Sequence, residues 1–264
     1  KIMRERNESF ESDLVSYIKE LEENKKLSEE IINNEKFKNN YFVNLSHELR
    51  TPINVITSIL QLTDNMMRNK TMTYKKAEGY IEIINRNCEN LLKIINDIID
   101  SSKIETGNYK INKKNNNIVY IAEEVALNMS NFIEGKGLSL IIDPEIEEVF
   151  IECDKLDIER CIINLIGNAI KFTSEGGTIT ISISELHKKV RISVKDTGVG
   201  IDEKYHNAIF DRFGQVYSES SEEFGGSGLG LTLTRNLINL HGGEISVVSE
   251  KGKGSEFIII LPIQ

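Results

Sequence analysis

The stretch Phe42-Val43-Asn44-Leu45-Ser46-His47-Glu48-Leu49-Arg50-Thr51-Pro52 organises this chain of 264 residues. His47 lies off the apolar stripe of the stretch with Glu48 beside it, and Thr51 follows one turn later. Pro52 removes a backbone donor, so we expect it to bend or loosen the helix. The apolar residues recur at spacings of three and four, as in an amphipathic helix that buries one face: positions 42, 45, 49, 53, 56 and 60.

An isolated His–Glu pair is usually a surface feature, so the composition and the other motifs decide its meaning. The chain is 39% hydrophobic and 28% charged, which is typical of a soluble globular protein. Its net charge of -9 argues against a nucleic-acid partner. Cys88, Cys153 and Cys161 fit no metal or disulfide pattern, and the last two are expected to be core thiols.

No apolar run approaches the ~20 residues of a membrane span, and no signal peptide is recognisable. The chain begins with Lys1 in the middle of a helical pattern. We therefore expect a cytoplasmic fragment of a longer protein, which could carry a sensor upstream and be anchored in the cell membrane.

The first 107 residues read as helices. Residues 1–35 carry apolar positions near a heptad seam, with polar Asn24 as a candidate register residue, which predicts a signalling coiled coil; a solvated single helix is the alternative. Residues 36–107 read as two helices joined by a turn at 69–73, with Thr73 as the second N-cap and Gly107 at the end. Because one hairpin cannot cover both apolar stripes, we expect two copies to form a dimeric four-helix bundle.

Residues 108–264 mix strand and helix patterns, which predicts an α+β two-layer sandwich with helices on one face of a sheet. Tyr109 and Ile111 suggest a short strand, and 112–117 a polar linker. Helices are expected over 118–132, over 155–172 with Asp154 as N-cap, and over 229–240. Further strands are expected over 138–142, 149–152, 178–184, 190–195, 244–249 and 255–261.

Four clusters in this second half carry chemistry. Asn164, Asn168 and Lys171 share one face of a helix, where amide oxygens suit Mg²⁺ and the Lys suits a phosphate; a merely polar face is the alternative. Asp196-Thr197-Gly198-Val199-Gly200 follows a strand, so its carboxylate could accept from an amino group such as that of adenine, although a plain turn would look similar.

The third cluster, Phe210-Asp211-Arg212-Phe213, offers two aromatics that could anchor a mobile segment or simply belong to the core. The fourth, Gly225 to Leu231, runs into a helix N-terminus, which makes an anion site. It is neither a P-loop nor a Rossmann turn. Between them, 215–224 is rich in Ser and Glu and suits a lid over a nucleotide.

In this order, the motifs resemble those of the sensor histidine kinases of bacterial two-component systems. Residues 46–52 look like the phosphoacceptor box, 164–173 like the N box, 196–200 and 225–230 like the two glycine boxes, and 210–213 like the F box. Gly252 to Phe257 resembles the closing element. The resemblance covers about residues 36–264 and implies a dimerisation and phosphotransfer hairpin joined to a Bergerat-type ATP-binding domain.

The resemblance also implies roles. His47 would attack the γ-phosphoryl group of ATP, Glu48 could accept its proton, and Thr51 would serve a phosphatase activity toward the partner regulator, unless its hydroxyl merely satisfies a helix carbonyl. Asn168 would ligate Mg²⁺ and Asp196 would bind adenine. The remaining residues expected around the nucleotide are Asn164, Lys171, Gly198, Gly200, Arg212, Gly226, Gly228, Leu229 and Gly230.

The resemblance thus predicts a homodimer that autophosphorylates on His47 and passes the phosphoryl group to an aspartate of a response regulator receiver domain. The alternative is an ATP-gated conformational clamp of the Hsp90 or MutL type, which needs no phosphoacceptor box. A degenerate nucleotide-binding scaffold is disfavoured because every expected site residue is present.

Overall fold

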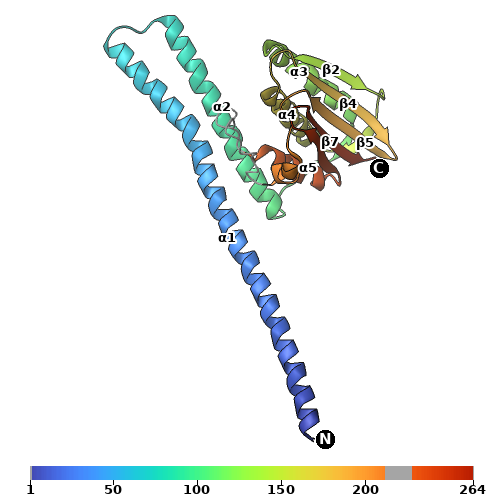
Figure 1. The fold of residues 1–264 in the computed structure, drawn as a ribbon. Coiled ribbons are helices and arrows are strands. Elements are labelled where there is room, and N and C mark those ends of the chain that lie inside the picture. Colours follow the sequence, from blue (N-terminus) through green and yellow to red (C-terminus); the bar gives the residue numbers. More distant parts are fainter. Residues whose placement is uncertain (1, 212–227, 264) are drawn as a thin grey trace. The chain divides into compact units, whose positions relative to one another are not determined.

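The computed structural model describes residues 2–211 and 228–263 (Figure 1). They fall into two units, Lys1–His47 and Glu48–Gln264, which divide inside the first helix. The expected lid at 215–224 therefore lies outside the described residues, as do Arg212, Phe213 and Gly226.

The first unit is the beginning of helix α1 (Ile2–Arg68). Three residues of the predicted heptad seam have described side chains, namely Tyr17, Leu21 and Asn24, and all are exposed in the single chain. Two exposed apolar side chains one helical turn apart are what an uncovered coiled-coil seam presents. The helix is confirmed, and its pairing with a second copy stays a prediction.

The second unit begins with the rest of α1, which runs through a buried Pro52, and continues into α2 (Tyr74–Glu105). The predicted caps are confirmed. Thr73 Oγ1 accepts from the Lys76 backbone N–H, and Gly107 follows the α2 C-cap in the left-handed region with φ 68°. Among the described helices, none combines the length and apolar character that a membrane crossing requires.

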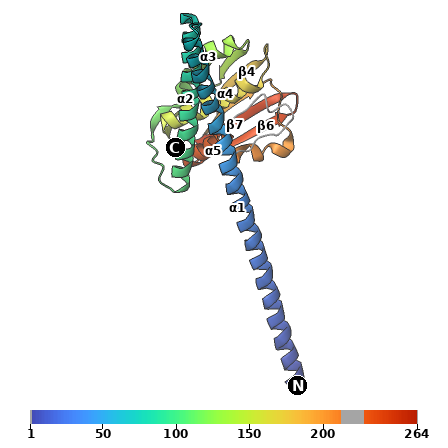
Figure 2. The same ribbon diagram turned by 90° about the vertical axis from the view of Figure 1, so that its left-hand side faces the viewer.

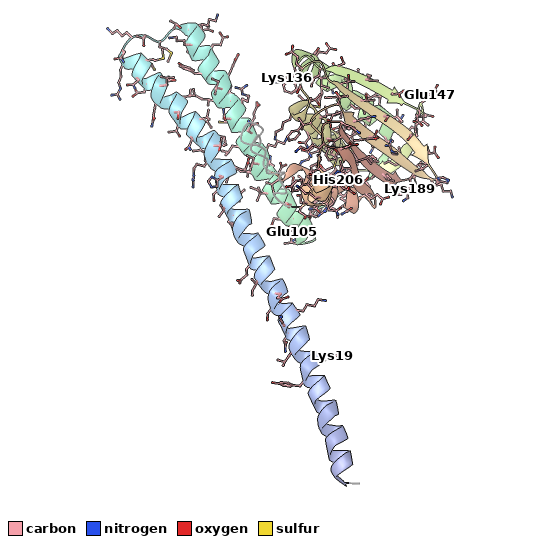
Figure 3. The ribbon with its side chains drawn as sticks, viewed as in Figure 1. Lys19, Glu105, Lys136, Glu147, Lys189 and His206 are labelled. Atoms are coloured by element: carbon pink, nitrogen blue, oxygen red, sulfur yellow. The ribbon has the colours of Figure 1, made fainter. Side chains whose placement is uncertain are left out.

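After α2 the chain builds a five-stranded mixed sheet with strand order β2-β4-β5-β7-β6. Strands β2 and β4 are parallel, and the other neighbours are antiparallel. The strand bounds are β2 (Ser139–Pro144), β4 (Thr178–Leu186), β5 (Lys189–Asp196), β6 (Glu244–Glu250) and β7 (Gly254–Pro262). In Figure 3, the labelled Lys189 marks the start of β5, just after the tight turn that closes the predicted β4–β5 hairpin.

Three helices cover one face of this sheet: α3 (Ile118–Gly135), α4 (Lys155–Phe172) and α5 (Gly230–Leu240) (Figures 1 and 2). Helix α4 packs between α3 and α5. The 3₁₀ helices η1 (Glu203–Tyr205) and η2 (Ala208–Phe210) complete the domain. The core is rich in isoleucine, and its fully buried members include Ile158, Ile162, Ile166, Ile179, Ile181 and Ile192.

One part of the strand prediction is wrong. No strand forms at Tyr109–Ile111; instead β1 (Lys114–Asn117) forms within the supposed linker and pairs antiparallel with β3 (Phe150–Cys153). Strand β1 is polar because its first residues face solvent, while Asn116 Nδ2 donates to the Cys153 carbonyl at 2.9 Å. Tyr109 packs against the core instead of joining a sheet.

The predicted fold class is confirmed as a helical region followed by a sheet covered by helices on one face. The predicted core positions of Cys153 and Cys161 are also confirmed, since both thiols are buried. The dimeric bundle and the three-part division at 35 and 107 stay predictions.

Candidate functional site

Helix α4 supplies the central side chains of the site. Asp154 Oδ1 caps the helix by accepting from the Leu156 backbone N–H at 3.1 Å. One side of α4 is buried against the sheet, so the opposite side, with Asn164, Asn168 and Lys171, is left half-buried. The fold thus turns the predicted polar face away from the core.

Asn164 joins α4 to the start of α5. Its Nδ2 donates to Thr234 Oγ1 at 3.0 Å, and the Thr234 hydroxyl donates to the Gly230 carbonyl at 2.9 Å. A Cβ atom on Gly230 would lie 2.3 Å from Asn164 Oδ1. Two residues predicted separately from the N box and the second glycine box therefore touch, and a side chain at position 230 would have to displace that of Asn164.

Lys171 and Glu48 carry opposite charges, and each affects the pKa of the other. Burial lowers the pKa of Lys171, and the Glu48 carboxylate partly opposes this shift. Burial also raises the pKa of Glu48, while Lys171 pulls it back down. A half-buried carboxylate with a raised pKa is a better proton acceptor than an ordinary surface glutamate, which suits the base predicted beside His47.

Asn168 lies one turn from both Asn164 and Lys171. Within the described ranges its side-chain amide makes no hydrogen bond, so the amide oxygen can serve a ligand. A single neutral oxygen beside a cationic lysine is a sparse donor set. It fits Mg²⁺, which keeps several waters and shares its coordination with substrate phosphates.

Asp196 ends β5 and is buried. Its Oδ1 accepts from the Gly198 backbone N–H at 2.8 Å. Burial raises the pKa of Asp196, and hydrogen bonds from the backbone of Gly198 and Ser255 oppose the shift. The carboxylate is thus held in place by backbone, which suits a residue that hydrogen-bonds one edge of a base.

The glycines after Asp196 are required by the fold of the loop itself. A Cβ atom on Gly198 would lie 2.3 Å from the Phe172 carbonyl oxygen. Gly200 has φ 66°, and a Cβ atom there would lie 2.0 Å from the Glu250 carbonyl oxygen. At both positions, backbone of the same domain already occupies the space that a side chain would take, and this alone explains the glycines. Close approach to an adenine therefore stays a prediction.

Thr173 is a site residue to which the sequence analysis gave no role. It follows α4 and is buried, and its Oγ1 has no hydrogen-bond partner among the described residues. Its methyl group fills the space where a Gly177 side chain would point. A buried hydroxyl without a partner beside the Asp196 loop is what a polar ligand atom could satisfy.

The second glycine box is described from Gly228 onward. Gly228 has φ 61°, Leu229 is buried, and α5 begins at Gly230. The F-box aromatic Phe210 is a core residue, since it packs edge-on against Phe257 at a centroid distance of 6.2 Å. For Phe210, the core interpretation is confirmed.

The phosphoacceptor box lies on α1, where His47 and Thr51 are both exposed. The other histidines have other settings. His241 is the buried C-cap of α5, with Nδ1 2.7 Å from the Leu237 carbonyl and Nε2 accepting from the Asp154 backbone N–H. His187 lies in the β4–β5 turn, and His206, labelled in Figure 3, lies 3.3 Å from the Ile201 carbonyl.

Comparisons with known proteins agree with this architecture. A profile of the His Kinase A (phospho-acceptor) domain matches residues 37–107, and one of the histidine kinase-, DNA gyrase B- and HSP90-like ATPases matches residues 153–264. The non-motile and phage-resistance protein of Caulobacter vibrioides is 35% identical over 87% of this chain and 27% of its own length. The autoinducer 2 sensor kinase/phosphatase LuxQ of Vibrio vulnificus is 36% identical over 85% of this chain and 26% of its own.

Solved structures point the same way. Histidine kinase ThkA in complex with response regulator protein TrrA superposes with a TM-score of 0.64 at 25% identity, over 84% of this chain and 61% of that one. Full-length ShkA in complex with AMPPNP superposes with a TM-score of 0.63 at 27% identity, over 83% and 45%. The chain spans about a quarter of the length of the curated relatives above.

A phosphoacceptor hairpin followed by an ATPase domain of this fold defines the ATP-dependent protein histidine kinases. The clamp alternative is not supported, because the phosphoacceptor profile covers the His47 box. The chain belongs to the sensor histidine kinases of two-component systems, of which it is a catalytic portion.

Proposed function

We propose that His47 accepts the γ-phosphoryl group of ATP and passes it to an aspartate of a response regulator. The observation that carries this proposal is the joint presence, in one chain, of the His47–Glu48 box and of an ATPase domain whose N box and second glycine box meet at Asn164 and Gly230. ThkA, a relative by structure, has been solved with a response regulator, which supports a partner of this kind.

The nucleotide would lie along the polar face of α4. Asp196 would bind the adenine amino group, with the unpartnered Thr173 hydroxyl nearby. Asn164, Lys171 and the glycines at 226, 228 and 230 would hold the phosphates, next to Arg212 and Leu229. Asn168 would hold Mg²⁺, which when bound neutralises charge on the phosphates.

In the transfer step, a ring nitrogen of His47 forms a bond to the γ-phosphorus while the bond from that phosphorus to the β,γ-bridging oxygen breaks, and ADP leaves. The attacking nitrogen must carry no proton, so the proton of the imidazole lies on the other nitrogen, where Glu48 accepts it. The raised pKa of Glu48 favours this role.

Thr51 is proposed to act in the dephosphorylation of the response regulator, which ends the signal. Its hydroxyl would orient a water molecule toward the aspartyl phosphate of the regulator, and orientation of this kind supplies much of the rate gain in hydrolysis. The exposed position of Thr51 one turn from His47 supports access by a partner.

The proposed working unit is a homodimer, in which a second hairpin covers the apolar stripes of α1 and α2, and a sensor in the longer protein drives it. These stripes are uncovered in the single chain, where the side chains of Leu60, Leu92 and Ile99 are all exposed. Exposed apolar stripes of this length are typical of an interface.

The test is incubation with ATP labelled in the γ-phosphoryl group. We expect label on the chain that is lost in acid and stable in base, and its loss in His47→Ala with nucleotide binding retained. Full acid-labile labelling of His47→Ala would refute the assignment.

A further inference from the structure

Helices α2 and α4 are joined by a partly buried ionic contact that the proposed function does not use. Arg160 of α4 donates from Nη2 to Asp97 Oδ1 at 2.6 Å and from Nη1 to Asp100 Oδ2 at 2.7 Å. The exposed fraction is 32% for the Arg160 side chain, 5% for Asp97 and 19% for Asp100. Charge-assisted bonds of this length are strong and directional. We call this contact the Arg160 bridge.

Around the Arg160 bridge, the apolar side chains of α4 contribute little, whereas α5 also packs against α2. Leu156 and Ile163, which flank Arg160 by about one turn on α4, remain 73% and 44% exposed. The bridge adds specificity to this contact, because a guanidinium held by two carboxylates fixes both distance and angle.

The Arg160 bridge lies beside residues proposed to hold phosphates. Lys93 and Asp97 of α2 line a cavity of about 180 Å³ together with Arg160, Asn164 and Gly230. The phosphate side of the ATP-binding domain thus faces the α2 helix of its own chain. The mutual pKa effects of Glu48 and Lys171 agree with this orientation.

The connection after α2 also contacts the ATP-binding domain. Tyr109 donates its hydroxyl to Asp157 Oδ1 at 2.6 Å, and the Asn112 backbone N–H donates to Asp154 Oδ2 at 2.9 Å. Ile104 and Tyr109 also pack against the core of the ATP-binding domain. The linker is therefore fastened to α4 directly after Gly107.

We infer that Arg160 is a positioning residue that holds the phosphate side of the ATP-binding domain against α2 and thereby raises the rate of phosphoryl transfer. This inference rests on the proposed autophosphorylation. The bond changes are those given above, with the γ-phosphoryl group leaving ADP and joining the His47 nitrogen.

Variants of Arg160 test the bridge itself. Because a small misplacement of reacting groups costs on the order of 10- to 100-fold in rate, we expect Arg160→Asp to lower kcat by this factor and to change KM for ATP by less than about twofold. The double variant Arg160→Asp/Asp100→Arg returns one guanidinium and two carboxylates to the contact and should recover most of kcat. An unchanged or raised kcat in Arg160→Asp, or no recovery in the double variant, would overturn the positioning role.

A matched control and a physical readout separate positioning from folding. Lys155, on the same helix, pairs with Glu124 of α3 at 2.9 Å, within the ATP-binding domain, so Lys155→Ala should leave kcat unchanged. Hydrogen exchange of residues 93–104 in the nucleotide-free protein should speed up at least tenfold in Arg160→Asp and not in Lys155→Ala. Equal exchange in both variants would count against the bridge. If the wild-type chain takes up no label at all, the proposed function fails, whereas label in wild type with a negative Arg160 result rejects this inference alone.

Discussion

Replacing Gly230 by alanine probes the contact between α4, which carries Asn164, and α5, which begins at Gly230. The new Cβ atom would lie 2.3 Å from Asn164 Oδ1, about 1 Å short of ordinary van der Waals contact. Because Gly230 begins α5 and Asn164 lies within α4, the asparagine side chain must give way. A shift of this size breaks its 3.0 Å hydrogen bond to Thr234.

The expected cost follows from two effects. Overpacking of this kind costs about 1–3 kcal/mol, and loss of the hydrogen bond costs about 0.5–1.5 kcal/mol. We expect Gly230→Ala to lower the free energy of unfolding of the ATP-binding domain by about 2 kcal/mol and to weaken nucleotide binding about tenfold, since the displaced Asn164 faces the proposed phosphate position.

Gly167 provides the matched control. It lies inside α4 next to Asn168, and a Cβ atom there would meet nothing within 4 Å. Gly167→Ala should therefore stabilise the helix by about 0.5–1 kcal/mol. Urea unfolding followed by circular dichroism and titration with a fluorescent nucleotide measure both variants. Equal stability and equal affinity of Gly230→Ala and Gly167→Ala would refute the contact.

Three further predictions follow from the phosphoacceptor box and the hairpin. Burial raises the pKa of Glu48, so Glu48 stops acting as a base when the pH falls through this raised value. The pH–rate profile of autophosphorylation should therefore show an acid limb above the ordinary pKa of a glutamate, and this limb should move to higher pH in Lys171→Met. An acid limb that does not move in Lys171→Met would contradict the role of Glu48. Thr51→Ala should keep near-normal autophosphorylation and slow dephosphorylation of the regulator by tenfold or more, on the order of a lost orienting group; a parallel fall in both would make Thr51 a structural residue. Light scattering at micromolar concentration should give the mass of a dimer, and a monomer would argue against the four-helix bundle.

Local features of the site could be read from the sequence. Helix α4 has the predicted bounds because Asp154 caps its first turn and the apolar spacing runs without a break to Phe172. The turn between α1 and α2 and the β4–β5 hairpin follow from Thr73 and from alternating strands in the same way. In each case a few neighbouring residues determine the structure.

Contacts between distant segments could not be read in this way. Strand β1 was missed because its sequence is polar and its pairing with β3 depends on residues more than thirty positions away. The Asn164–Thr234 hydrogen bond and the Arg160 bridge join residues about 60 to 70 positions apart. Thr173 was not singled out because a hydroxyl is exceptional only once it is known to be buried without a partner among the described residues.

The central claim is that one histidine of four receives the phosphoryl group. The most direct measurement is mass spectrometry of the chain after incubation with ATP and Mg²⁺, with digestion at alkaline pH, where phosphohistidine survives. We predict phosphorylation of the peptide that carries His47 and of no peptide that carries His187, His206 or His241. A phosphoryl group on any of these three, or none on His47, would contradict the account.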